Sequence, residues 1–549
     1  MPPPPTITAA IPRPVLCVID HLHRSPAVAD AAVAGRYVHA GRELSPGRQP
    51  DWLRAADGID EEWGIEWVKL YEGLDLGSAF AATGQRPYLD TWEDLVESFC
   101  LQVPVGHHTS DVSARRIQNW LYAWQRFAAA PGYPGLRTGL AERLTARIEA
   151  DVAHLAAHLT AERNHRTLEI YTLVLAALAF DRTHDASAAL ELLADNAAAD
   201  IGDDGVHRER SSDYHCLVLR SLVGAVACAA GTGLEVPPVL VDRVDRAATV
   251  ALHLQRPDGT MPALSDGDQS DFRALLALAA DVLDRPDLSW GATLGGEGRA
   301  PAELGATFAA GGYVVQRSGW GDGPVAYGDE AWAVLDCGPL GDGGHGHYDQ
   351  LSVELHTGGR TVVVDPGRFT YDRHDGPWRH WFKGTAAHNT VTVDGLDQVT
   401  YRPGKPRGPL PQARLVRRHD DGRHDTVMAA ATSPNHDATH RRTLRLCRMA
   451  RSWLVVDEMT APAGASHRYD LRWHLAPEAW GTIGRQDLPG RVEFTVPGAR
   501  ITIVDPPGPV RIAPGWVSPA YGVRHPAPVV VVTARDAAST RFITEVAPC

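Results

Sequence analysis

Two histidines separated by one glycine lie in the most polar segment of the chain. They are His345 and His347, in the run Gly-Asp-Gly-Gly-His-Gly-His-Tyr-Asp that begins at residue 341. Asp365 follows the next apolar run, and His388 precedes a later one. Two imidazoles and a carboxylate form a donor set that suits tetrahedral zinc, with water or another oxygen completing it. We therefore predict a zinc site at His347, Asp365 and His388, and the alternative is that these are turn residues and strand caps.

A second group of polar side chains lies in the N-terminal half. One segment, Glu162-Arg163-Asn164-His165-Arg166, opens a helical pattern, and another, Asp204–His215, precedes a second helix and contains Tyr214. A phenol has an ordinary pKa of about 10 and can serve as an acid or, near positive charge, as a base. Ser212 or Asp213 is expected to cap the helix that follows. Tyr214 is then either a catalytic candidate or a core aromatic residue of the first turn.

The elements that carry the second group are helices rich in Ala and Leu. Apolar residues such as Leu168, Tyr171 and Leu175 recur at helical spacing and mark buried faces. The predicted helices are Ile117–Ala130, Ala141–Leu159, Arg166–Phe180, Ala186–Ile201, Asp213–Ala230, Val239–Leu254 and Asp271–Leu283. Many antiparallel helices in sequence predict a helical array, either a solenoid or a closed toroid.

After about residue 301 the pattern changes to short, β-branched strands bounded by Gly, Asp or Pro. Leu351–Leu355 alternates like a half-buried strand, whereas Thr361–Val364 is apolar throughout and predicts burial on both faces. The other predicted strands include Tyr313–Arg317, Trp332–Cys337, Thr390–Val393, Thr443–Leu446, Trp453–Asp457, Tyr469–His474, Val492–Val496 and Val529–Thr533. We predict a multidomain α+β protein in which a helical array precedes an antiparallel β sandwich or layered sheets. The predicted divisions are a disordered, Pro-rich 1–20, a helical 21–300 and a β domain, 301–549.

Composition narrows the function classes. The 549 residues carry 53 Lys plus Arg against 67 Asp plus Glu, a formal net charge of −14, which argues against a general nucleic-acid binder. We identify no apolar segment near the roughly 18 residues that span a bilayer, so we expect no membrane partner. The seven cysteines are scattered without a CxxC pair, which indicates reduced thiols. The N-terminus lacks the basic and apolar regions of a secretory signal, so we expect a cytoplasmic protein.

The motifs together resemble the heparinase II/III-like polysaccharide lyases. In that family's β domain the signature is similar to Gly344–Ser352, followed by Asp365-Pro-Gly and Ala387-His-Asn-Thr-Val. Arg163-Asn-His and the segment Asp204–His215 stand in the places of the family's two helical motifs. The resemblance spans roughly residues 110–480. It implies an incomplete (α/α) toroid, a layered antiparallel β domain, and an active site in the groove between them.

The resemblance also implies an activity and roles for particular residues. Members of the family cleave uronic-acid-containing polysaccharides by β-elimination, and alginate-cleaving relatives share the arrangement. The implied roles are Tyr214 as general acid/base, Asn164, His165 and His345 around the uronate carboxylate, and His347, Asp365 and His388 as ligands of a largely structural Zn²⁺. Further candidates for substrate binding are Arg163, Arg166, Glu209, Arg379 and Trp381. Some members recruit a second tyrosine from the β domain, and Tyr371 is the one tyrosine between Asp365 and His388.

Three functions follow from this pattern. The leading prediction is a lyase that acts on an acidic polysaccharide or oligosaccharide, with no organic cofactor and with a homodimer as one possible assembly. A glycoside hydrolase would need paired carboxylates, for which Asp349 and Glu354 are the candidates. A glycan-binding or exopolysaccharide-assembly protein of the same fold would bind a glycan without turnover.

Overall fold

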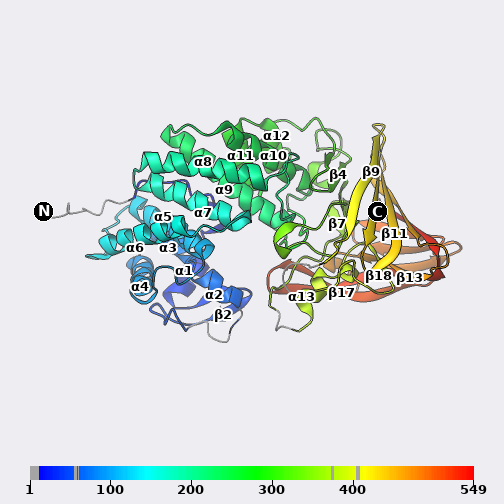
Figure 1. Ribbon diagram of the computed structural model, residues 1–549, viewed down its shortest axis with the longest axis horizontal. Helices are drawn as coiled ribbons and strands as arrows, with labels where there is room; N and C mark the ends of the chain where they lie inside the picture. The colour runs from blue at the N-terminus through cyan, green and yellow to red at the C-terminus, as the bar shows by residue number, and fades with distance from the viewer. Residues whose placement is uncertain (1–11, 55–58, 60, 373–375, 403–407) are drawn as a thin grey trace. The chain divides into compact units, whose positions relative to one another are not determined.

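The computed structural model describes residues 12–54, 59, 61–372, 376–402 and 408–549 (Figure 1). Its contacts divide the chain into two compact units. The helical unit comprises Met1–Asp200 with Arg220–Asp242, and the sheet unit comprises Ile201–Leu219 with Arg243–Cys549. The division crosses helices α9 (Ser212–Thr232) and α10 (Pro238–Leu254). The first turns of α9, which carry Tyr214, therefore belong to the same compact unit as the sheets.

The helical unit is built from antiparallel amphipathic helices, in which α5 packs between α3 and α7. Trp120, Trp124 and Phe127 of α5 are buried, as helical spacing predicts. The helices are α1 (Pro26–Val33), α2 (Glu61–Trp67), α3 (Glu72–Thr83), α4 (Arg86–Gln102), α5 (Ser110–Ala129), α6 (Leu140–Ala157), α7 (Arg163–Ala179) and α8 (Thr183–Asp200), with a hairpin of β1 (Tyr37–His39) and β2 (Arg42–Leu44). The predicted helices from Ile117 to Ile201 correspond to α5–α8, and α1–α4 lie before the first helix that the sequence predicts.

The N-terminal segment is ordered where the structure describes it. We expected disorder over residues 1–20, of which 1–11 lie outside the described residues. Val15, Val18 and Ile19 are buried, and the Val15 amide donates to the Gln125 side chain at 2.8 Å. Burial of these apolar side chains compensates for ordering the backbone, so the expectation is wrong for residues 12–20.

Helix α9 is an apolar segment of a length that we did not expect from the sequence. By length and apolar composition its 21 residues are sufficient to cross a bilayer, with a mean hydropathy of 1.5 in the most apolar window. However, 67% of that window is buried inside the protein, which is typical of a core helix of a soluble fold, so this is only weak evidence for a membrane span.

Over its described residues, the sheet unit contains three antiparallel sheets and the helices α11 (Arg273–Leu283), α12 (Pro286–Ala292) and α13 (Trp378–Lys383). The five-stranded sheet has the order β3-β4-β5-β6-β7, the eight-stranded sheet β14-β15-β16-β19-β12-β11-β10-β9, and the four-stranded sheet β17-β18-β13-β8. The strands are β3 (Ala306–Phe308), β4 (Tyr313–Arg317), β5 (Trp332–Asp336), β6 (Val353–Thr357), β7 (Arg360–Val363), β8 (Val391–Val393), β9 (Gln412–Asp420), β10 (His424–Ser433), β11 (His436–Cys447), β12 (Ser452–Thr460), β13 (His467–His474), β14 (Gly484–Leu488), β15 (Arg491–Val496), β16 (Ala499–Val504), β17 (Val510–Ala520), β18 (Val523–Ala537) and β19 (Ser539–Pro548). The predicted order, helices before antiparallel sheets, is confirmed.

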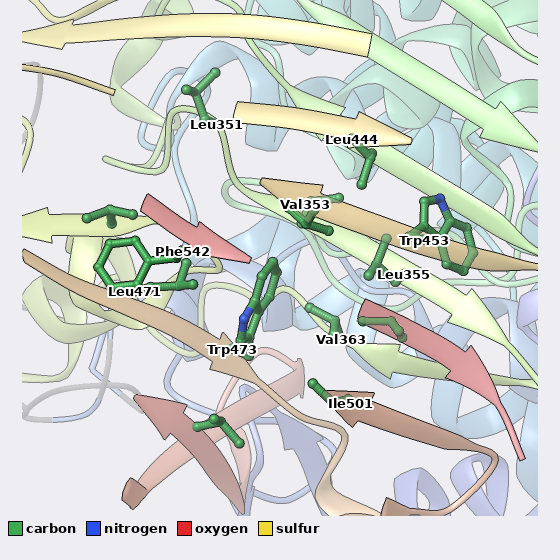
Figure 2. Close-up of a cluster of buried hydrophobic side chains, with 14 of the residues drawn as sticks. Leu351, Val353, Leu355, Val363, Leu444, Trp453, Leu471, Trp473, Ile501 and Phe542 are labelled. Atoms are coloured by element: carbon green, nitrogen blue, oxygen red, sulfur yellow. The ribbon is translucent and has the colours of Figure 1, made fainter. Parts of the chain in front are cut away.

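The sheets share one apolar core (Figure 2). Strands β10, β11 and β12 alternate buried and partly exposed residues, the pattern of sheets with one face against the core. The core joins side chains from all three sheets, including Leu355, Leu444, Trp453, Trp473, Ile501 and Phe542. Strand β6 departs from the prediction, because all five of its residues are buried and neither face meets solvent.

Candidate active site

The histidine-containing loop lies against the segment that precedes α9. The Asp342 amide donates to the Arg208 carbonyl at 3.0 Å, and Gly341 approaches Glu209 so closely that a Cβ there would lie 1.9 Å from the Glu209 carbonyl oxygen. Only glycine permits this contact. The glycine-rich run therefore brings His345 towards the start of α9.

Tyr214 is presented by the first turn of α9. Its amide donates to the Ser211 hydroxyl at 3.3 Å, which makes Ser211 the N-cap, in place of the predicted Ser212 or Asp213. The Ser212 hydroxyl instead donates to the Pro262 carbonyl and accepts from the Leu264 amide at 3.1 Å. These bonds hold the segment Pro262–Asp266 beside the first turn of α9.

Two tyrosines meet in this region. The hydroxyls of Tyr214 and Tyr371 lie 3.0 Å apart, and Arg368 Nη1 donates to the Tyr371 hydroxyl at 2.9 Å. Arg368 also donates from Nε and Nη2 to the two oxygens of Asp268, at 2.9 and 2.7 Å. The ring of His345 lies 4.1 Å from that of Tyr214 between centroids. The structure thus brings together Tyr214, His345 and Tyr371, all three named from the sequence, and adds Arg368.

A buried carboxylate that sequence reasoning missed organises the two histidines. Asp266 accepts from His345 Nδ1 at 3.0 Å and from His347 Nε2 at 2.9 Å, and both of its oxygens bind the Arg379 guanidinium. Burial opposes its ionisation, yet Arg379 and the two histidines hold the pKa of Asp266 well below its usual range. An ionised carboxylate only accepts, so both contacting histidine nitrogens carry hydrogen.

The pKa values of the tyrosines show how the pair is protonated. Burial raises the pKa of Tyr214 well above its ordinary value, and the neighbouring Tyr371 adds to this shift. Burial also raises the pKa of Tyr371, but Arg368 opposes that shift. Both phenols are therefore protonated in the free protein at neutral pH. A negative charge on the pair is better stabilised at Tyr371, where the guanidinium is in direct contact.

The three predicted zinc ligands converge. One ligand atom from each of His347, Asp365 and His388 lies within 4.8 Å of the other two, and all three residues are buried. His388 Nδ1 lies 3.0 Å from Asp365 Oδ2, and its Nε2 lies 3.1 Å from the Phe382 carbonyl, which fixes the hydrogen on Nε2. Although burial opposes it, Asp365 raises the pKa of His388.

The donor atoms of this group suit a metal ion. Burial lowers the pKa of His347 to about 4, so the ring is neutral at pH 7; its Nε2 hydrogen is bound by Asp266 and its Nδ1 has no hydrogen-bond partner. Nδ1 therefore presents a lone pair. Metal-binding histidines commonly donate their other nitrogen to a carboxylate or a carbonyl, as both histidines do here. The residues fit a His–Asp–His zinc site.

The helical unit carries four of the predicted residues, at the start of α7. Arg163 has φ of +75°, a left-handed conformation uncommon outside glycine, and its amide donates to Asp200 at 3.0 Å. Arg166 donates to the Thr160 carbonyl at 2.8 Å, and His165 is half exposed, 3.9 Å from Asp111. Asn164 is partly buried beside them. The assignment of Asn164 and His165 to substrate stays a prediction.

The other predicted residues lie in the sheet unit. Glu209 is buried, with Oε1 3.9 Å from His345 Nε2. Arg379 lies over the Tyr371 ring at 4.9 Å, and Trp381 packs on Phe382 with ring centroids 4.7 Å apart. Asp266 and Asp268 gave no clear sequence signal beyond an acidic Ser-Asp-Gly-Asp turn near residue 265. The one sequence feature that could have pointed to Arg368 is its position directly after the Asp365-Pro-Gly motif.

Sequence comparison identifies both parts of the chain. Residues 23–285 match the Heparinase II/III N-terminus, and residues 300–544 match Heparinase II/III-like, C-terminal. A heparin-sulfate lyase of Pedobacter heparinus is 24% identical over 359 residues, 61% of this chain and 52% of that enzyme. An alginate lyase of Stenotrophomonas maltophilia is 28% identical over 160 residues, 27% of this chain and 21% of that enzyme. The chain thus aligns with about half the length, or less, of these relatives.

Solved structures show the same fold over almost the whole chain. The crystal structure of heparinase III has a TM-score of 0.81 at 18% identity and covers 98% of this chain and 87% of its own. A heparan sulfate lyase mutant from Pedobacter heparinus has a TM-score of 0.70 at 21% identity and covers 98% and 84%. These neighbours share the architecture of a helical toroid followed by antiparallel sheets. With both family profiles matched in order, the chain belongs to the heparinase II/III-like family.

Proposed function

We propose that this protein is a polysaccharide lyase that cleaves a uronic-acid-containing glycan by β-elimination. The proposal is supported by the relatives, which are named as heparin-sulfate and alginate lyases. The single observation that carries it is the contact of Tyr214 with Tyr371, with Arg368 bound to the second hydroxyl. The two phenol hydroxyls are close enough to exchange a proton directly, so one can act as the acid and the other as the base.

The reaction needs one proton removed and one supplied. The C5 hydrogen of a uronate leaves as a proton, its bonding pair forms the C4–C5 double bond, and the bond from C4 to the bridging O4 breaks. The departing oxygen takes a proton and becomes a hydroxyl. Because C5 is adjacent to a carboxylate, charge accumulates on that group during the reaction, and hydrogen bonds or positive charge directed at it lower the barrier.

The two tyrosines divide these tasks in our proposal. Tyr371, in contact with Arg368, is the better site for a phenolate and acts as the base towards the C5 proton. Tyr214, whose pKa is raised by burial and by Tyr371, keeps its proton and donates it to O4. This assigns Tyr214 the acid part of the general acid/base role that the sequence predicted. Asp266, bound to His345 Nδ1, orients the His345 ring beside the pair.

The roles towards the uronate carboxylate rest on the family motif. We propose that His345, Asn164 and His165 neutralise it, with Arg163, Arg166 and Trp381 contacting flanking sugars. Glu209 faces His345 Nε2 and supports that ring. Arg379 is occupied by Asp266, so we assign it to holding the histidines in place, not to direct contact with substrate.

Zinc is the metal that we propose for His347, Asp365 and His388. When bound, it would supply a structural link between the loop of the two histidines, the end of β7 and the start of β8. No step of the elimination depends on it. Its proposed effect on the reaction is indirect, through His347 and the shared partner Asp266, which also binds His345.

The hydrolase alternative named Asp349 and Glu354 as its paired carboxylates, and neither is accessible to a glycan. Asp349 and Glu354 are buried, and Glu354 is bound by Arg256 and by the Asp365 amide at 3.0 Å. Burial raises the pKa of Asp349 to about 6. The same burial keeps this carboxyl group out of contact with a glycan in solution. Both residues support the fold around the predicted metal site.

The test is an ultraviolet absorbance screen with heparan sulfate, hyaluronate, chondroitin, alginate and bacterial exopolysaccharides. Elimination produces a conjugated C4–C5 unsaturated uronate that absorbs in the ultraviolet, and hydrolysis does not. We expect a rise on at least one polymer with the wild type and with Tyr88→Phe, a control tyrosine whose hydroxyl binds Asp30 in the helical unit. New reducing ends without absorbance would indicate a hydrolase. Binding without either product would indicate a glycan-binding protein.

A further inference from the structure

We propose that Arg524, with the hairpin that carries it, forms a binding subsite for a carboxylate or sulfate group of the glycan, beside the two tyrosines. The proposal rests on the proposed function, because it names a part of the molecule that recognises the acidic substrate. None of its residues on the β17–β18 hairpin belongs to the sequence motifs described above.

Three aromatic rings hold the Arg524 side chain. Its guanidinium carbon lies 3.7 Å from the centroid of Trp378, 4.5 Å from that of Phe369 and 5.1 Å from that of Trp516. Trp378 lies on α13, Phe369 in the loop after β7 and Trp516 on β17. Stacking on ring faces fixes a guanidinium without using its N–H groups. The donors are therefore positioned in advance for a ligand.

The charge of Arg524 is not paired within the described part of the chain. Among the residues that the structure describes, no carboxylate lies within ion-pair distance of it, and no hydrogen bond occupies its guanidinium. The two arginines at the tyrosine pair differ: Arg368 is neutralised by Asp268, and Arg379 by Asp266. Arg524 is partly exposed, so its charge is available to an anion from solution.

The hairpin is fixed to the loop that carries Tyr371. The Gly522 amide donates to the Phe369 carbonyl at 2.7 Å, and the Ser518 amide donates to the Pro366 carbonyl at 2.8 Å. The Tyr521 hydroxyl accepts from the Tyr371 amide at 3.2 Å, with the two rings 5.7 Å apart. Arg524 follows Tyr521 by three residues. The subsite and the tyrosine pair therefore share one rigid support.

The geometry points to an anionic oxygen group with two acceptor atoms. A guanidinium matches carboxylate and sulfate in two parallel hydrogen bonds, and the rings exclude water from one of its sides. An acidic glycan carries such groups on each uronate or sulfated sugar. In our proposal, Arg524 binds the anionic group of a neighbouring sugar while the tyrosines hold a uronate.

The experiment measures affinity and turnover on the same polymers. Dissociation constants for heparan sulfate, a chemically desulfated heparan sulfate, chondroitin sulfate and alginate are determined with wild type, Arg524→Gln, Arg524→Lys and Arg500→Gln. Arg500 is an exposed arginine of β16, in a different sheet, and serves as the matched control. We expect Arg524→Gln to weaken binding of the polymers that the wild type binds by about tenfold, the size of one charge-assisted contact.

Each result has one meaning. Arg500→Gln should bind as the wild type does, and Arg524→Lys, which keeps the charge and loses the planar fork, should fall between wild type and Arg524→Gln. If Arg524→Gln binds only the sulfated polymers more weakly than the wild type does, the subsite binds sulfate. If it binds all of the polymers more weakly, the subsite binds carboxylate. Equal affinities of wild type and Arg524→Gln, or no binding of any polymer by either, would overturn the subsite. Weakened binding by Arg524→Gln without elimination product from the wild type would support the subsite and contradict the lyase.

Discussion

At the scale of single residues, Asp266 connects the two roles that we propose for the histidine loop. It binds His345, beside the tyrosines, and His347, in the predicted metal site. One ionised carboxylate therefore fixes which nitrogen of each ring carries hydrogen. His347 Nδ1 is left with a lone pair because its other nitrogen is bound in this way.

This arrangement predicts a metal-dependent stability. We expect purified protein supplied with zinc to contain about one zinc per chain, and His388→Ala to contain much less, because three ligands become two. A chelator should lower the thermal midpoint of the wild type and leave that of His388→Ala unchanged. Metal analysis and thermal unfolding measure this directly. A wild type without bound zinc, or with a midpoint that is indifferent to chelator, would contradict the site.

At the scale of elements, a buried ion pair ties the sheets to the functional loops. Arg442 on β11 donates to the carbonyls of Leu351 and Asn389, and Asp457 on β12 accepts from its Nε at 2.7 Å. Both members of the pair are fully buried. Leu351 ends the loop of the two histidines, and Asn389 follows His388. The ends of two functional loops are thus held by one side chain from the eight-stranded sheet.

The ion pair predicts a pH-dependent stability difference. Burial opposes ionisation of Asp457, but Arg442 and His440 hold its pKa below the usual value. Its contribution is therefore complete at pH 7 and is lost as the pH falls below about 4, where the unfolded chain takes up the proton. Asp457→Asn should cost about 3 kcal/mol at pH 7. The difference in thermal midpoint from wild type should narrow as the pH falls.

The control for this prediction is Asp487→Asn, an exposed carboxylate that pairs with Arg485 on β14 of the same sheet. It should match the wild type at every pH, because an exposed pair contributes little. A midpoint for Asp457→Asn equal to that of wild type at pH 7, or a difference that grows with acid, would contradict the role assigned to the pair.

Strand β6 shows which element-level features the sequence could not predict. The alternation of Leu351, Val353 and Leu355 with polar residues predicted one exposed face. Instead Glu354 is buried against Arg256, and His356 binds the Gly328 carbonyl at 3.1 Å. An alternating pattern shows which side chains are polar, and it does not show which are exposed. A polar side chain that has a hydrogen-bond or ion-pair partner can be buried and still give the same pattern. Such partners come from distant segments.

At the scale of the whole molecule, local pattern predicted the order of helices and sheets. The family motifs named Tyr214, His345 and the group of His347, Asp365 and His388; the structure brings Tyr214 next to His345 and gathers the group of three. Their roles stay predictions. Asp266 and Arg368 were missed because each acts through a contact made far along the chain. Arg368 meets Asp268 one hundred residues away, and Asp266 meets His345 across a similar separation. The pairing of Tyr371 with Tyr214 likewise depends on the fold and not on spacing.

The tyrosine pair is the central claim, and one measurement tests it directly. Initial rates of ultraviolet absorbance are recorded for wild type, Tyr214→Phe and Tyr371→Phe on the polymer that the wild type cleaves, after thermal unfolding shows that each variant is folded. We predict that each substitution lowers kcat by about 100-fold or more, since each removes a proton-transfer group. A folded variant of either tyrosine with a kcat close to that of the wild type would contradict the assignment of acid and base to this pair.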